Sequence, residues 1–218
     1  LRSDAVNQAI IANGNVLENV PFSGINLFSN GLDTRTRGVD LIANLRTPIA
    51  GFGSIDWSLT GNVAKTKVTR IKDTPAPLAA SNQALFDKVA ISNLETASPS
   101  FKMILAGVYR NGRLTVAAKE NLYGNAKRYA DPGDGQYYLD KTGTKATTDI
   151  DVEYGLLDNL SLSAGAINLF DVKPNRVNQT ALMIAALAGD PANEIYPKYS
   201  PYGVNGGYYY ARARIKFR

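Results

Sequence analysis

The sequence contains no cysteine and no histidine. Without cysteine, the chain forms no disulfide and offers no thiolate as a nucleophile or metal ligand. Without histidine, it lacks the commonest general base and the commonest metal ligand of proteins. Because these absences remove the side chains that most enzymes depend on, we expect no enzymatic activity, no metal centre and no cofactor.

Long hydrophobic runs are also absent. The longest uncharged apolar stretch, residues 181–189, has about half of the roughly 20 residues that a membrane-spanning helix needs. A helical anchor is therefore excluded from this sequence, whereas a β-barrel would leave no such run. The net charge of +5 indicates either an anionic partner or a mixed surface with a modest basic excess. We favour the mixed surface and expect no nucleic-acid partner.

What the sequence does contain is strict alternation of apolar and polar residues. The stretch Tyr208–Phe217 is the clearest case, and because side chains of a strand have a period of two, each series lies on one face. The apolar series is Tyr209, Ala211, Ala213, Ile215 and Phe217, and the other series carries Arg212, Arg214 and Lys216. A soluble sheet buries such an apolar face in a core, whereas a membrane barrel turns it toward lipid.

The same alternation predicts six further strands, which gives seven in all. Their apolar series begin at Val39, Ile55, Phe101, Leu114, Ile150 and Leu160. Short helices are predicted over residues 4–11, 84–94 and 180–188. The connections alternate between short (48–53, 111–112, 158–159) and long (72–98, 131–145, 171–203). Outer-membrane barrels have this arrangement, with short periplasmic turns and long extracellular loops.

Aromatic and charged residues divide between the two predicted faces. Four aromatic side chains lie on apolar series near the short turns, where a membrane girdle would sit, namely Trp57, Tyr109, Tyr154 and Phe217. Seven charged side chains belong to the polar series and are expected to face a wet lumen or a plug domain: Asp56, Asp149, Asp151, Glu153, Arg212, Arg214 and Lys216. A soluble β-sandwich binding module is the alternative, because its core would take the same aromatics and its surface the same charges.

Three segments carry a resemblance to a known family. Thr34–Leu41 resembles the strand in which TonB-dependent receptors have an Arg-Gly-Val-Glu/Asp-Leu element. Ile167–Pro174 is similar to their Asn-Leu-Phe-Asp-x-x-Pro element near the end of the penultimate strand. Ser200–Phe217 is similar to their closing strand, although the family usually ends on the aromatic residue and this sequence adds Arg218.

The resemblance implies an all-β, antiparallel transmembrane β-barrel of 22 strands in the outer membrane. Residues 1–218 would be its C-terminal part, with the last seven or so strands and short helices in long extracellular loops. The plug domain, the TonB box and the earlier strands are absent from this sequence. The implied partners are outer-membrane lipid, the barrel-assembly machinery and, through the missing plug, the TonB–ExbB–ExbD complex.

The implied activity is uptake of a scarce ligand, such as a ferric siderophore, cobalamin or an oligosaccharide, with energy delivered through TonB. Five residues at the loop end of one hairpin are the candidates for contact with this ligand: Tyr123, Arg128, Tyr129, Tyr137 and Tyr138. Aromatic rings with a nearby cation suit a sugar or an aromatic chelate, through stacking and hydrogen bonds. An outer-leaflet aromatic girdle is the alternative interpretation of the same residues.

Overall fold

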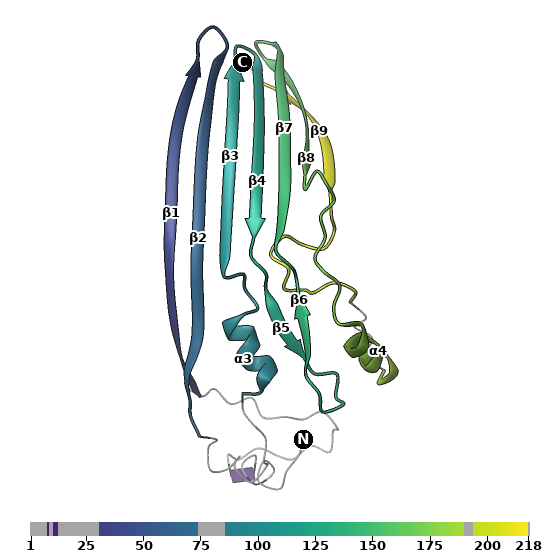
Figure 1. The fold of residues 1–218 in the computed structure, drawn as a ribbon. Helices are drawn as coiled ribbons and strands as arrows, with labels where there is room; N and C mark the ends of the chain where they lie inside the picture. The colour runs from purple at the N-terminus through teal and green to yellow at the C-terminus, as the bar shows by residue number, and fades with distance from the viewer. Residues whose placement is uncertain (1–7, 9–10, 13–30, 74–85, 190–193, 218) are drawn as a thin grey trace.

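A computed structural model describes residues 8, 11–12, 31–73, 86–189 and 194–217 of the chain (Figure 1). The helix predicted over residues 4–11 therefore lies almost wholly outside the described residues. The described elements are β1 (Leu32–Ile49), β2 (Gly53–Ile71), α3 (Lys88–Glu95), β3 (Phe101–Asn111), β4 (Leu114–Tyr123), β5 (Lys127–Ala130), β6 (Tyr138–Lys141), β7 (Lys145–Leu157), β8 (Leu160–Ile167), α4 (Gln179–Leu187) and β9 (Tyr208–Ile215).

The seven predicted strands form one antiparallel sheet, in the order β1-β2-β3-β4-β7-β8-β9. Each strand of this sheet is thus hydrogen-bonded to the next strand in the sequence, except that β5 and β6, which lie between β4 and β7 in the sequence, form a separate pair. The short turns and the C-terminus lie at one end of the sheet, and the long connections with α3 and α4 lie at the other (Figure 1). The predicted all-β class and the segregation of the connections are confirmed.

Two parts of the chain differ from the prediction. Strand β1 continues through Pro48, which pairs with Ser54, so the turn is shorter than predicted. Proline is tolerated there because β1 is an edge strand of this sheet, so no second neighbouring strand requires a hydrogen bond from the proline nitrogen. The predicted loop over residues 131–145 lies partly within a short hairpin, in which β5 pairs with β6. Its strands have four residues each, which is too short to show a clear period of two.

The register of the sheet brings the apolar series of all seven strands onto one face. Directly opposed residues share a face of an antiparallel sheet, so the pairs test the prediction position by position. The apolar partners include Val39–Val63, Leu59–Leu105, Tyr109–Val116, Val116–Val152, Tyr154–Leu162 and Ala164–Ala211. The apolar face is therefore continuous from β1 to β9.

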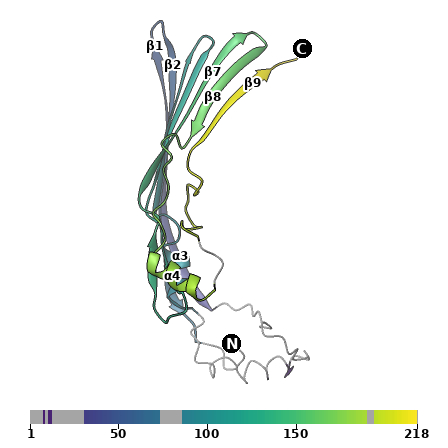
Figure 2. The same ribbon diagram turned by 90° about the vertical axis from the view of Figure 1, so that its right-hand side faces the viewer.

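No second sheet covers this apolar face in the part of the chain that the structure describes. Val39 is 71% exposed, Leu45 65% and Tyr154 50%, and Figure 2 shows the strands as a single layer. The buried hydrophobic side chains of the described residues are few: Tyr123, Ala126, Ala166 and Ala181. The described residues therefore do not form a β-sandwich, in which two apolar faces would be in mutual contact. Neither α3 nor α4 is long and apolar enough to span a membrane.

Aromatic rings on each face of the sheet lie over glycines of the adjacent strand. A Cβ at Gly107 would lie 2.9 Å from the ring of Trp57, which occupies the space above this glycine. On the polar face, a Cβ at Gly165 would lie 2.6 Å from both the Ile150 carbonyl oxygen and the Tyr210 hydroxyl. Both glycines are thus required by close approach of a neighbouring strand.

We predict that Gly165→Ala destabilises the sheet by about 1–3 kcal/mol, because the new methyl group must displace backbone or the Tyr210 ring. For a domain of this size, each kcal/mol lowers the melting temperature by roughly 2–4 °C. Gly61→Ala is the matched control, since its Cβ would make only ordinary contacts of 3.8 and 3.9 Å. Equal melting temperatures for the two variants in detergent would contradict the prediction.

Candidate functional site

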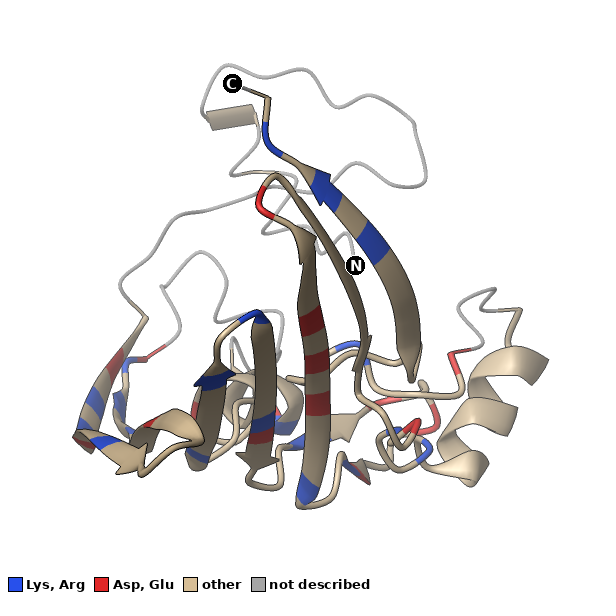
Figure 3. Cartoon of the chain, turned by 90° about the horizontal axis from the view of Figure 1, so that it is seen from above, with Lys and Arg blue, Asp and Glu red and all other residues tan. Residues whose placement is uncertain are grey.

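The polar face carries the seven predicted charged residues together. Asp149, Asp151 and Glu153 follow one another along β7, and Arg212 and Arg214 along β9 (Figure 3). Asp56 lies in the same cross-strand row as Asp151, through Val108 and Ala117. Lys216 follows β9 with the same period.

Two ion pairs cross the whole width of β8. Arg212 contacts Asp151 at 3.2 Å, and Arg214 contacts Glu153 at 3.6 Å, although β8 lies between β7 and β9. The pairs are possible because the residues of β8 that lie between these partners on this face are small, namely Ser161, Ser163 and Gly165. The Tyr210 hydroxyl also donates to Asp151, at 2.6 Å. Sequence reasoning could not specify these partners, because they depend on the register of three strands.

Two other carboxylates of the polar face, Asp56 and Asp149, are paired as well. Asp56 lies between Arg110, which donates to it, and Arg46, whose Nε is 3.7 Å from a carboxylate oxygen. Asp149 pairs with Lys119 at 2.8 Å. Lys216 makes no ion pair with any described residue. These pairs are partly exposed, so each contributes only about 0–1 kcal/mol; their larger consequence is a polar face whose charge is mostly compensated within the sheet.

The four predicted girdle aromatics lie on the apolar face. Trp57 is 39% exposed and Phe217 is 90% exposed, and Tyr154 opposes Leu114 and Leu162 on its neighbouring strands. The Tyr109 hydroxyl donates to the Phe52 carbonyl in the β1–β2 turn at 2.7 Å, which ties this ring to the short-turn end. The polar tip of the ring is thus bonded at the margin of the apolar face.

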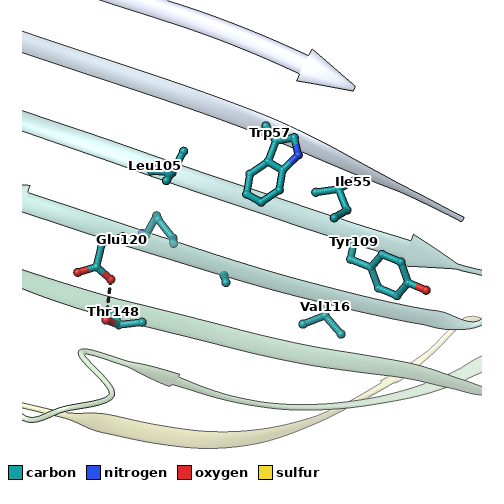
Figure 4. A pocket seen from close by; sticks show the side chains of 10 residues that line it. Ile55, Trp57, Leu105, Tyr109, Val116, Glu120 and Thr148 are labelled. Carbon is teal, nitrogen blue, oxygen red and sulfur yellow. Dashed lines mark hydrogen bonds between the residues drawn. The ribbon is translucent and has the colours of Figure 1, made fainter. Parts of the chain in front are cut away.

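One carboxylate on the apolar face was not singled out from the sequence. Glu120 opposes Leu105 and Thr148, and the Thr148 hydroxyl donates to it at 2.6 Å (Figure 4). Both side chains line a shallow groove of about 290 Å³ beside Trp57 and Tyr109. The signal in the sequence is the period of two, since Val116 and Ala118 lead directly to Glu120.

The five predicted ligand-contact residues do not form one cluster. Tyr129 and Tyr137 lie together under the Lys88 ammonium, which is 4.0 Å from the centre of one ring and 5.8 Å from the other. The Tyr138 hydroxyl instead donates to Asp134 at 2.8 Å, and this bond raises the pKa of the tyrosine. Lys88 was missed in the sequence because it comes from α3, on a different loop.

Tyr123 is buried at the end of β4, apart from the other four. Its ring lies 5.2 Å from that of Tyr202, and the Lys102 ammonium is 5.1 Å from the ring centre. The Tyr202 hydroxyl donates to the Thr142 carbonyl at 2.9 Å. Tyr123 therefore anchors the long loops to the sheet, and within the described residues it has little surface left for a ligand.

Arg128 lies on a different side of β5 and faces a cavity of about 320 Å³ between this hairpin, α4 and the segment 194–199. Its Nε is buried without a hydrogen bond to any described residue, and the buried Tyr199 hydroxyl lies beside the Arg128 backbone without a bond of normal geometry. Burial raises the pKa of Tyr199, and nearby Asp140 raises it further. Burial also raises the pKa of Asp140, against the opposing effects of the Asn178 amide and Arg128. Polar groups of this kind can recognise a ligand that enters the cavity.

The Asn-Leu-Phe-Asp segment after β8 forms a turn that joins three strands. Asn168 and Asp171 have left-handed backbones, with φ of 53° and 54°, a conformation that Asn and Asp adopt more readily than other side chains do. The Asn168 side chain donates to the Val172 carbonyl and accepts from the Val172 backbone amide. The backbone amide of Asn168 donates to Asp149 on β7 at 2.8 Å. Asp171 accepts from the Gly207 amide at 2.9 Å, just before β9. The motif thus has a structural role at the loop end of the sheet.

We predict that protonation of Asp171 loosens this turn. The Gly207 amide, helped by Lys173, lowers the pKa of Asp171. The stabilising effect of the carboxylate is therefore complete above the ordinary pKa of about 4 and is lost as the pH falls through the lowered value. The hydrogen-exchange protection factor of the Gly207 amide should decrease in that acidic range. Asp171→Asn should lower protection at neutral pH and remove the pH dependence, whereas Asp131→Asn on the β5–β6 loop should do neither.

No protein-family model matches the chain, and no curated protein matches it. Among the solved structures that match, the chain is similar to copper transporter OprC, with 20% sequence identity and a TM-score of 0.48. The match covers 85% of this chain and 24% of that chain, so the chain spans about a quarter of the length of this structure.

Proposed function

We propose that the chain is the C-terminal part of an outer-membrane β-barrel that imports a scarce ligand as a TonB-dependent receptor does. The observation that carries the proposal is the continuous, exposed apolar face of a single antiparallel sheet. In aqueous solution that face would be exposed over its whole width, whereas in a membrane the acyl chains would cover it. The opposite face, with its compensated ion pairs, suits a hydrated lumen.

Strand length and the sheet edges support the same proposal. The seven strands have between 8 and 19 residues, and a tilted membrane strand needs about 9–11. The sheet is open, with β1 and β9 at its two edges. Because unpaired backbone groups are costly in lipid, further strands would have to pair with both edges to close a barrel.

In this proposal, the long-loop end receives the ligand. The Lys88–Tyr129–Tyr137 cluster offers stacking surfaces and a cation, and the Arg128 cavity offers buried donors. These features suit a ferric siderophore, cobalamin or an oligosaccharide, all of which present rings and polar atoms. Energy would come from TonB–ExbB–ExbD through a plug domain that this sequence does not contain.

We predict that an arginine on the apolar face destabilises the protein in a membrane. Leu59→Arg should cost roughly 2–4 kcal/mol near the bilayer midplane. Ser58→Arg is the matched control, because Ser58 is the preceding residue of β2 and lies on the polar face. The measurement is the free energy of unfolding by urea in phosphatidylcholine vesicles. If Leu59→Arg is tolerated as well as Ser58→Arg, the lipid-facing assignment is wrong.

We further predict that uptake depends on both the loop cluster and the energy source. A deletion strain should grow on one of the candidate ligands only when it carries the wild-type gene and an intact TonB. Tyr129→Ala with Tyr137→Ala should reduce uptake at least tenfold at limiting ligand, whereas Asp134→Asn should leave it nearly unchanged. Wild-type growth without TonB would contradict the energy coupling, and full uptake by the double variant would contradict the loop contact.

A further inference from the structure

Four cations form a compact group on the β1–β2 ribbon, at the long-loop end of the sheet. Arg35 opposes Lys67, and Arg37 opposes Lys65. All four side chains are exposed, and together with Thr69 they line a groove of about 320 Å³. We call Arg35, Arg37, Lys65 and Lys67 the cation quartet.

The cation quartet lies on the apolar face. Arg37 is two residues before Val39, and Lys65 is two residues after Val63, so the period of two places them on the side of the Val39–Val63 pair. Pairing of β2 with β3 ends at Val63 and Phe101, and the ribbon continues beyond it (Figure 1). The quartet thus begins where the apolar face ends.

No acid of the described chain lies within ion-pair distance of the quartet. Like charges directly opposed across two strands repel, yet none of the four makes an ion pair with a described residue, although eight such pairs occur elsewhere. Asp40 lies on the opposite face and bonds Asn62 at 2.6 Å. Glu95 of α3 accepts from the Val68 amide at 2.7 Å. Asp33 and Arg70 lie at the end of the ribbon. Lys127 and Glu95 line the adjacent groove together with Lys65 and Lys67.

We propose that the cation quartet binds the phosphorylated headgroup of an outer-leaflet lipid whose acyl chains lie along the apolar face below it. An amphiphile matches both features at once, since its phosphates meet the four cations and its chains meet Val39, Val63 and Leu41. Clusters of Lys and Arg at a membrane surface attract anionic lipids in this way, and guanidinium groups suit phosphate oxygens. This inference rests on the proposed function, because it requires the apolar face to lie in a membrane.

The test is binding of fluorescent diphosphoryl lipid A to the full chain in a zwitterionic detergent. Replacing the quartet by glutamine (R35Q, R37Q, K65Q and K67Q together) should weaken binding at least tenfold. A control variant loses the same charge elsewhere (K141Q, R176Q, K198Q and K216Q together) and should bind within about twofold of wild type. Fully dephosphorylated lipid A should bind wild type as weakly as the quartet variant binds diphosphoryl lipid A.

Three outcomes would overturn the inference: equal binding by the quartet variant, equal loss in the control variant, or complete displacement of the lipid by millimolar inorganic phosphate, which would mean a simple anion site. Without lipid, the quartet variant should melt at a higher temperature than wild type, because the repulsion among the four cations is removed. An unchanged or lower melting temperature also counts against the inference.

The Leu59→Arg and Ser58→Arg variants distinguish failure of the quartet assignment from failure of the proposed function. If Leu59→Arg is costly and lipid binding is unaffected, only the quartet assignment fails, whereas tolerance of Leu59→Arg ends the proposed function too.

Discussion

The structure depends on one constraint, which is that six successive strand pairs keep a single register of apolar side chains. A slip of one residue in any pair would move the apolar series of that strand to the other face. The pairs from Val39–Val63 to Ala164–Ala211 show no such slip, and the irregularities lie at the strand ends, near Asp33 and Gly155. Because the register is kept, Asp56, Asp149, Asp151 and Glu153 all meet cations on the polar face. On the apolar face, Glu120 accepts a hydrogen bond from Thr148.

The alternation of residues was sufficient to predict the seven strands of the main sheet and the face on which their side chains lie. Side-chain direction in a strand follows from the backbone alone, so a series such as Ile55, Trp57 and Leu59 needs no knowledge of its partners. The ion-pair partners, in contrast, could not be predicted from the alternation. The contact of Arg212 with Asp151 requires that β8 carry Ser163 and Gly165 between them, which becomes visible only when three registers are known.

The loop end was predicted less well, for a physical reason. Its contacts join segments far apart in the sequence, such as Lys88 with Tyr129 and Arg128 with Tyr199, and no periodicity relates them. The predicted ligand residues therefore separate into different surroundings, with Tyr123 buried against Tyr202 and Tyr138 bonded to Asp134. Short strands add to the difficulty, since the four residues of β5 show too few alternations to distinguish a strand from a loop.

The strand count has a consequence for closure. Each of the six antiparallel ladders reverses the chain, so β1 and β9 run in the same direction. If these two edges met, they would form a parallel ladder, which an all-antiparallel barrel does not contain. Any antiparallel cylinder that includes this sheet must therefore place an odd number of additional strands between β9 and β1. The sheet itself thus limits any such barrel to an even total number of strands.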